Sequence, residues 1–230
     1  MLGFGPEEWA AIMLSLKVAG TATALSLPIG IFVAFALARW RFPGHALLNG
    51  LVHLPLILPP VVTGYLLLAA FGPRGPIGAP LAELGIVVAF RWTGAALAAG
   101  VMAFPLMVRA IRLSIEAVDP RLEAAAATLG APRPLIFATI TLPMILPGVL
   151  AGTILAFAKA MGEFGATITF VSNIPGETRT VPSAIYAFLQ VPGGEDAAIR
   201  LVIIAVVIAM AALLVSEVLA RRVAARVSGQ

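Results

Sequence analysis

Five long apolar stretches constrain this chain more than any other feature of its sequence. Each is long enough to span a membrane, since a helix needs roughly 20 apolar residues to cross about 30 Å of hydrocarbon. Hydrophobic residues make up 60% of the chain and charged residues only 11%, whereas ordinary soluble domains carry about 25% charged residues. The sequence therefore predicts an all-α integral membrane protein, a single domain over residues 1–230, with about five transmembrane helices and six as the alternative count. The predicted spans are about 11–38, 46–70, 86–108, 143–170 and 198–220.

A polar segment at residues 116–143 separates the third apolar stretch from the fourth, and its sequence is EAVDPRLEAAAATLGAPRPLIFATITLP. Asp119 is suited to cap a short helix at its start, and Gly130 is suited to end it. Pro132 prevents this helix from continuing, and a second short helix is expected to follow until Pro143 interrupts it. The segment is therefore predicted to form two short helices joined by an elbow.

The first of these two helices carries a narrow apolar stripe beside charged residues. Leu122, Ala126 and Leu129 recur at i, i+4 and i+7 and so share one helix face. A solvated loop has no need of such a stripe, whereas a loop that docks into a groove on a soluble partner does. An ordinary connector between two spans is the alternative interpretation.

The same segment resembles the EAA loop of ABC importer permeases. That loop places its glutamate at position 124, where this chain has Ala124, and the acid here is Glu123. The matching positions are the glycine, isoleucine, leucine and proline at Gly130, Ile140, Leu142 and Pro143. The resemblance implies a cytoplasmic loop that couples transport to a separate ATPase subunit. The residues expected to make this coupling contact are Leu122, Glu123, Ala126, Leu129, Gly130, Ile140, Leu142 and Pro143.

The arginines orient the predicted bundle. If the loop at 116–143 is cytoplasmic, the N-terminus is periplasmic, the C-terminus is cytoplasmic, and the cytoplasmic side holds more arginine, as the positive-inside rule expects. The pI near 10.3 then reflects charge at the membrane edge, and no nucleic-acid partner is needed to explain it. Nine arginines lie on the inner side, namely Arg39, Arg41, Arg109, Arg112, Arg121, Arg133, Arg221, Arg222 and Arg226, and four on the outer side, namely Arg74, Arg91, Arg179 and Arg200. The expected location is the bacterial inner membrane.

The sequence contains no ATPase motif, catalytic cluster or cysteine. A phosphate-binding P-loop needs lysine directly after glycine, but Lys17 and Lys159, the only lysines, follow leucine and alanine. ATP and Mg²⁺ are therefore expected on a partner subunit, and the chain itself is expected to be no enzyme and to bind no cofactor. His45 and His53, the only histidines, lack the i, i+4 spacing of a helical metal pair. They are expected to lie near lipid headgroups rather than to bind metal.

Two features within the apolar stretches are candidates for the translocation path. Pro59 and Pro60 interrupt the second stretch, and the carbonyls freed by such breaks can face a watery cavity and line a substrate path. A kink that serves packing alone is the alternative. Lys159 and Glu163 stand at i, i+4 in or near hydrocarbon, where a charged pair indicates a functional role. A structural salt bridge is the alternative for this pair.

A polar loop at about 172–197 is predicted on the outer side. Hydroxyl, amide and guanidinium groups gather in its first part, where they could meet an oxyanion or an external protein. A plain polar connector is the alternative. The candidate residues are Ser172, Asn173, Thr178, Arg179 and Thr180.

The strings GEFGATITFVSNIPGETRT and VPGGE resemble the molybdate permease subunits of bacterial ABC importers, and LPPVV and AFPLMVRAIRL extend the likeness along the chain. This resemblance implies a type I importer permease fold in which a second copy of the chain completes the pore. It also implies two ATP-binding subunits as partners and a periplasmic molybdate-binding protein, with tungstate carried by the same system. A permease for sulfate or another oxyanion, a standalone secondary carrier and a membrane-embedded enzyme are the alternatives.

Overall fold

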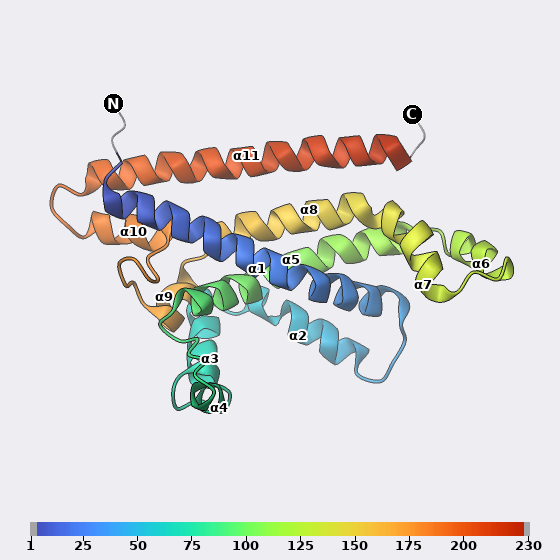
Figure 1. Cartoon of the computed structure of the whole chain (residues 1–230), viewed down its shortest axis with the longest axis horizontal. Helices are drawn as coiled ribbons and strands as arrows, with labels where there is room; N and C mark the ends of the chain where they lie inside the picture. The colour runs from blue at the N-terminus through green and yellow to red at the C-terminus, as the bar shows by residue number, and fades with distance from the viewer. Residues whose placement is uncertain (1–3, 228–230) are drawn as a thin grey trace.

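Long helices lie side by side along the longest axis of the molecule (Figure 1). The computed structural model describes residues 4–227. Within them, four helical runs are long and apolar enough to cross a membrane. The four are α1 (Pro6–Arg39), α5 (Trp92–Ala117), the run Arg133–Met161 that ends in α8 (Leu142–Met161), and α11 (Glu195–Val227).

The second apolar stretch is broken rather than straight. It forms α2 (His45–Ile57) and α3 (Pro60–Phe71), which are bent by 117° relative to each other. Pro60 has no backbone N–H to donate and disfavours a helical conformation in the residue before it, and Pro59 accordingly has an extended ψ of 136°. Counted as one broken span, this pair gives the five crossings that the sequence predicted. The short helix α4 (Gly78–Glu83) follows.

The helices at two other predicted spans differ in extent from the predicted ranges. The third span was expected at about 86–108, and α5 runs from Trp92 to Ala117, so its last turns carry Arg109 and Arg112 beyond the predicted apolar range. The fourth was expected at about 143–170. In the structure, α8 ends at Met161 and a separate helix, α9 (Gly165–Val171), follows a short turn around Gly162. The glycines on both sides of this turn lower the cost of leaving the helix.

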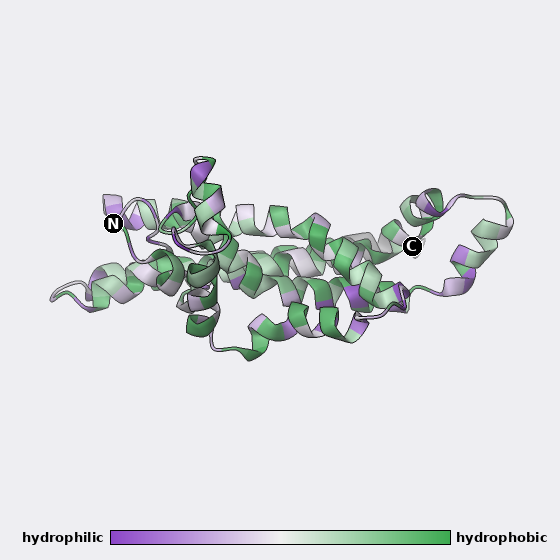
Figure 2. Cartoon of the chain, turned by 90° about the horizontal axis from the view of Figure 1, so that it is seen from below, coloured by the Kyte–Doolittle hydropathy of each residue, from purple (hydrophilic) through white to green (hydrophobic). Residues whose placement is uncertain are grey.

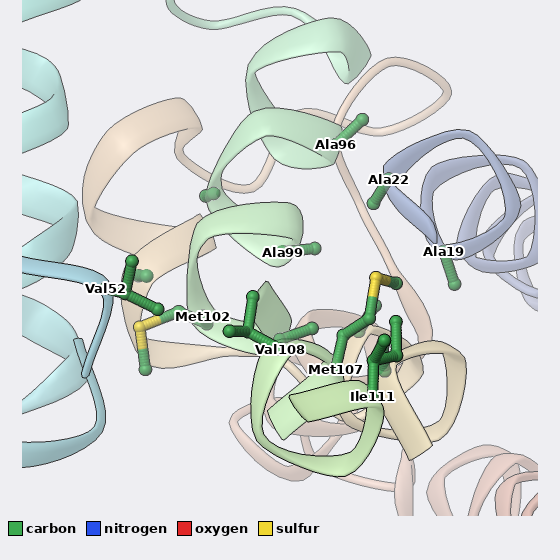
Figure 3. Packing of buried hydrophobic residues seen from close by; sticks show 14 of the residues in the cluster. Ala19, Ala22, Val52, Ala96, Ala99, Met102, Met107, Val108 and Ile111 are labelled. Carbon is green, nitrogen blue, oxygen red and sulfur yellow. The ribbon is translucent and has the colours of Figure 1, made fainter. Parts of the chain in front are cut away.

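Helix α5 lies at the centre of the core, with α1 and α8 packed along it. Figure 3 shows the alanines of α1 and α5, including Ala22 and Ala96, pointing into one packed region. Small side chains also bring α8 close to α5, because a Cβ added at Gly148 would lie only 1.6 Å from the Ser114 hydroxyl oxygen. Gly148 and Gly152, separated by one helical turn, thus mark a close helix contact, as such spacing predicts in membranes.

Polar residues gather towards the two ends of the bundle and on the loop between α5 and α8, while the middle is largely apolar (Figure 2). One end carries α6 (Pro120–Thr128) and α7 (Arg133–Ile136), and the other carries α10 (Val181–Leu189). The start of α1 and the end of α11 lie at opposite ends of the bundle (Figure 1), as an odd number of crossings requires. Of the predicted inner arginines, Arg221, Arg222 and Arg226 lie outside the part of the chain whose side chains are described.

Candidate functional site

The loop between α5 and α8 has the elbow that its sequence predicted. The Asp119 carboxylate accepts the backbone N–H of Arg121 at 2.9 Å and caps α6, whose first residue is Pro120. The helix ends at Thr128, and Gly130 then adopts a left-handed conformation with φ of 83°. Because this conformation is strained for residues with a Cβ, Gly130 permits the turn into α7.

The expected interruption of the second short helix at Pro143 is wrong. Helix α7, a π-helical turn at Phe137–Thr141 and α8 follow one another without a break. In the π turn, the N–H of Leu142 bonds to the carbonyl of Phe137, five residues earlier. A proline ring clashes with the carbonyl four residues before it in a regular helix, and the wider turn around Thr139 removes that clash. Helix α7 is therefore continuous, through this π turn, with the long helix α8.

The apolar stripe on α6 is exposed. Leu129 at the elbow is 89% exposed and Leu122 is 44% exposed, while Ala126 is half-buried. Leu122 of α6 and Leu129 just after it thus present apolar surface outside the bundle, as a docking element would. Ile140 and Leu142 are half-buried at the base of the loop, and Pro143 is exposed there.

Glu123 faces the body of the protein. Its Oε1 accepts a hydrogen bond from the Thr141 hydroxyl at 2.7 Å and lies 3.4 Å from Nη2 of Arg39, at the end of α1. Nη2 of Arg39 also donates to the backbone carbonyl of Val118 at 3.3 Å. In the structure the Glu123 carboxylate holds α6 against α1 and the π turn, and its expected part in the coupling contact stays a prediction.

Sequence reasoning missed Arg39 and Thr141 as partners of this acid. The available signal was the one-residue shift of Glu123 from the pattern position at Ala124. One residue turns a side chain by about 100° around an α-helix, which is enough to move the carboxylate from one face of α6 to another.

A second candidate region forms where the two broken spans meet. Helices α3 and α9 cross so closely that a Cβ added at Gly64 would lie 2.5 Å from the carbonyl oxygen of Ala166. A Cβ added at Gly165 would lie 2.7 Å from the Cβ of Pro60. The structure therefore brings Pro60, beside exposed Pro59, against the GEFG segment, although about 100 residues separate them in sequence.

The Lys159–Glu163 pair lies beside this crossing. Nζ of Lys159 is 2.8 Å from Oε2 of Glu163, whose side chain is only 2% exposed. Oε1 of Glu163 also accepts the N–H of Ala166 at 3.0 Å and so supports the first turn of α9. The geometry is that of a salt bridge that also stabilises the helix break, and a role for the pair in the translocation path stays a prediction.

The predicted outer polar residues bond mainly within their own loop and to α1. Thr178 is buried, accepts the N–H of Ile174 at 2.9 Å and donates to the carbonyl of Ser172 at 3.3 Å. Thr180 is also buried, with its hydroxyl 3.4 Å from that of Ser183. Ser172 itself is exposed and has a left-handed φ of 65°. This part of the loop has a fixed structure rather than a set of free hydroxyls.

Arg179 lies between the loop and the first helix. Its Nη1 is 3.1 Å from Oε2 of Glu7, and its Nε donates to Oδ1 of Asn173 at 3.2 Å. The Arg179 side chain is 18% exposed. Both candidate residues, Asn173 and Arg179, are therefore engaged in holding the loop against the start of α1.

A partly buried ion pair at the same end was not predicted from the sequence. Nε of Arg200 on α11 lies 2.8 Å from Oε1 of Glu8 on α1, and Nη2 lies 3.1 Å from Oε2. The Glu8 side chain is 3% exposed and that of Arg200 is 28% exposed, so this two-point contact joins α1 to α11 in a partly buried position. The only signal was opposite charge at the predicted outer ends of both spans.

The two histidines contact backbone carbonyls. Nε2 of His45 lies 3.0 Å from the Leu37 carbonyl, and Nδ1 of His53 lies 2.8 Å from the Asn49 carbonyl. Within residues 4–227, no group of three histidine, aspartate or glutamate side chains is placed to hold a metal ion.

Comparison with known proteins identifies the architecture. Residues 26–229 match the family of binding-protein-dependent transport system inner membrane components. The chain belongs to this family. It is therefore a multi-pass component of an inner membrane, as predicted.

Relatives in this family carry specific names. The molybdenum transport system permease protein ModB of Escherichia coli K12 is 63% identical over 93% of this chain and 94% of that protein. ModB of Haemophilus influenzae is 56% identical over 94% of both. The sulfate transport system permease protein CysT of Escherichia coli is 37% identical over 80% of this chain and 67% of that protein.

Solved structures confirm the fold predicted from the resemblance. A bacterial ABC transporter that imports the acidic polysaccharide alginate aligns with a TM-score of 0.75 at 19% identity, covering 95% of this chain and 80% of that one. The MetNI methionine ABC transporter aligns with a TM-score of 0.68 at 12% identity, covering 94% of both chains. The chain has the type I importer permease fold.

Proposed function

We propose that this chain is the membrane-spanning permease subunit of an ATP-driven importer of molybdate, with tungstate as a second substrate. The observation that carries this proposal is the 63% identity to a molybdenum permease over nearly its whole length. The sulfate permease is less similar and matches over a smaller share of its length. A permease for sulfate is therefore the second candidate.

The exposed elbow of the coupling loop supports a partner ATPase. Leu122 and Leu129 present apolar surface that a groove on a soluble subunit would cover. Because α7 continues without a break into α8, movement of this loop would be transmitted directly to a membrane span. ATP and Mg²⁺ belong to the partner in this proposal, since the chain has no nucleotide-binding motif of its own.

The crossing of α3 and α9 is our candidate for the wall of the translocation path. Broken helices near the middle of a membrane are a common way to build such a path, and Pro59, Pro60 and the Lys159–Glu163 pair all lie near this crossing. A second copy of the chain would complete the pore. A periplasmic protein would deliver the anion at the outer end, and a bacterial alginate importer has been solved in complex with its periplasmic protein.

Reconstituted transport tests the proposal. The purified permease, its ATPase subunit and its periplasmic binding protein are placed in liposomes, and uptake of labelled molybdate is measured with tungstate or sulfate as competitor. ATP-dependent uptake that tungstate inhibits and sulfate does not is the expected result. Preferential inhibition by sulfate would support the second candidate. Uptake by the permease alone would indicate a secondary carrier and overturn the proposal.

A further inference from the structure

A groove of about 850 Å³ opens at the coupling end of the bundle. It lies between the last turns of α1, which form one wall, and the base of the coupling loop (the segment from α6 to the π turn), which forms the other. Its lining combines apolar and aromatic side chains with two arginines and one acid. We infer that this groove is a binding site for an anionic phospholipid.

The apolar wall of the groove suits an acyl chain. Phe35 packs edge-on against both Trp40, at 6.1 Å between ring centroids, and Phe137, at 5.5 Å. Phe32 packs against Trp40 in the same way at 5.6 Å, yet Phe32 is 60% exposed and Trp40 is 46% exposed. Aromatic side chains at the end of a span favour the boundary between hydrocarbon and headgroups. A small free anion would make no use of this wall.

The charged wall suits a phosphate group. Arg39 and Arg133 line the groove, and Glu123 is the one acid among the residues that line it. These three side chains sum to a charge of +1. Nε of Arg39 is buried and has no hydrogen-bond partner within the described part of the chain, while Arg133 is exposed at the groove. An anionic headgroup would balance the net positive charge of this wall and would accept hydrogen bonds from the exposed guanidinium of Arg133.

The position of the groove selects a lipid as the occupant. Under the orientation proposed above, this end faces the cytoplasmic leaflet, where anionic lipids concentrate next to basic pockets between membrane helices. A phospholipid could place its phosphate between Arg39 and Arg133 and its chain along Phe32 and Phe35. The bound lipid would then touch both the end of α1 and the π turn that carries the coupling loop.

Native mass spectrometry of the purified permease tests this site. Delipidated protein is mixed with phosphatidylglycerol or phosphatidylcholine, and we expect several-fold more bound phosphatidylglycerol. Arg133→Gln is expected to remove most of this preference. Arg121→Gln is the matched control, because Arg121 is an exposed arginine of the same loop that does not line the groove. Arg39→Lys keeps the positive charge opposite Glu123. Its lipid binding tests whether the site needs the guanidinium group of Arg39 or only a charge.

Three results would overturn the inference. The first is equal retention of both lipids by the wild-type protein. The second is equal loss in Arg121→Gln and Arg133→Gln, which would indicate general surface charge. The third is full competition by inorganic phosphate or molybdate, which would indicate an anion site without a lipid. These measurements of lipid binding do not require transport. A result against the lipid site would therefore leave the proposed transport function unaffected, and a result against that function would leave the lipid site unaffected.

Discussion

Oε1 of Glu123 lies 3.4 Å from Nη2 of Arg39, and this contact joins the coupling helix α6 to the end of the first membrane helix. Both side chains are largely shielded, with 18% of Arg39 and 24% of Glu123 exposed. Thr141 donates to the same carboxylate oxygen. Contacts within the chain therefore help to set the position of α6.

Glu123→Gln should loosen the loop. Loss of the charge should weaken the partly shielded contact between Glu123 and Arg39 by about 1 kcal/mol, which corresponds to a several-fold loss of coupling between ATP hydrolysis and uptake. Molybdate uptake per ATP hydrolysed by the reconstituted transporter measures the effect. Glu116→Gln is the matched control, because Glu116 pairs with Arg112 at the same end without touching α6. Partial recovery in the Arg39→Glu, Glu123→Arg double variant is expected, and equal uptake in Glu123→Gln and wild type would contradict the idea.

The elbow of the coupling loop should tolerate asparagine but not valine. Gly130 has a left-handed φ of 83°, where a Cβ costs about 1–2 kcal/mol and a branched side chain costs more. Gly130→Val, or a charge in place of the exposed Leu129, should reduce uptake and co-purification of the ATPase while the permease stays folded and inserted. Gly130→Asn is the control. Normal uptake by Gly130→Val would show that this loop is not the docking element.

Sequence patterns predicted the coupling loop in detail because local chemistry determines it. Asp119 and Gly130 act within one or two turns of their own positions, and each has the predicted role in the structure. The long helices followed from the length of the apolar stretches in the same way: within residues 4–227, four are long enough to span a membrane, or five if α2 and α3 form one broken span. Pro143 was misjudged because the response to a proline depends on whether the preceding helix can widen into a π turn.

The contacts between distant segments could not be predicted. Glu8 with Arg200, Arg179 with Glu7, and Gly64 against Ala166 each join segments that lie more than 100 residues apart. Nothing in the local pattern around these residues specifies the partner. The outer loop was read as a cluster of free polar groups for the same reason, since its internal hydrogen bonds are visible only once the chain is folded.

Gly64→Ala should destabilise the crossing of α3 and α9. The added Cβ would lie 2.5 Å from a backbone oxygen, that of Ala166, and overpacking of this kind costs about 1–3 kcal/mol. Gly50→Ala is the matched control, because a Cβ there meets no atom within 4 Å and alanine favours the helix. A lower thermal unfolding midpoint in detergent is expected for the first variant only. An equal midpoint for the two variants would argue against a tight crossing.

The two ends of the chain should lie on opposite sides of the membrane. A reporter placed before Met1 should be periplasmic, and one placed after Gln230 should be cytoplasmic; both of these residues lie outside residues 4–227. The opposite ends of the bundle (Figure 1) and the excess of arginine at the coupling end support this orientation. If both reporters are active on the same side, the number of crossings is even and the five-span topology is wrong.

Arg179→Ala should act through the fold of the outer loop. Arg179 bonds to Glu7 and Asn173, so its loss should free the loop from α1 at a cost of about 1 kcal/mol, with a several-fold loss of uptake and unchanged association of the ATPase. Glu7→Gln removes the same ion pair from the other side and should have a similar, salt-sensitive effect, with little further loss in the double variant. Uptake that falls in Arg179→Ala but not in Glu7→Gln would instead indicate a direct contact of Arg179 with the anion or the delivering protein. Unchanged unfolding midpoints and uptake in both variants at low salt would show that the loop is only a connector.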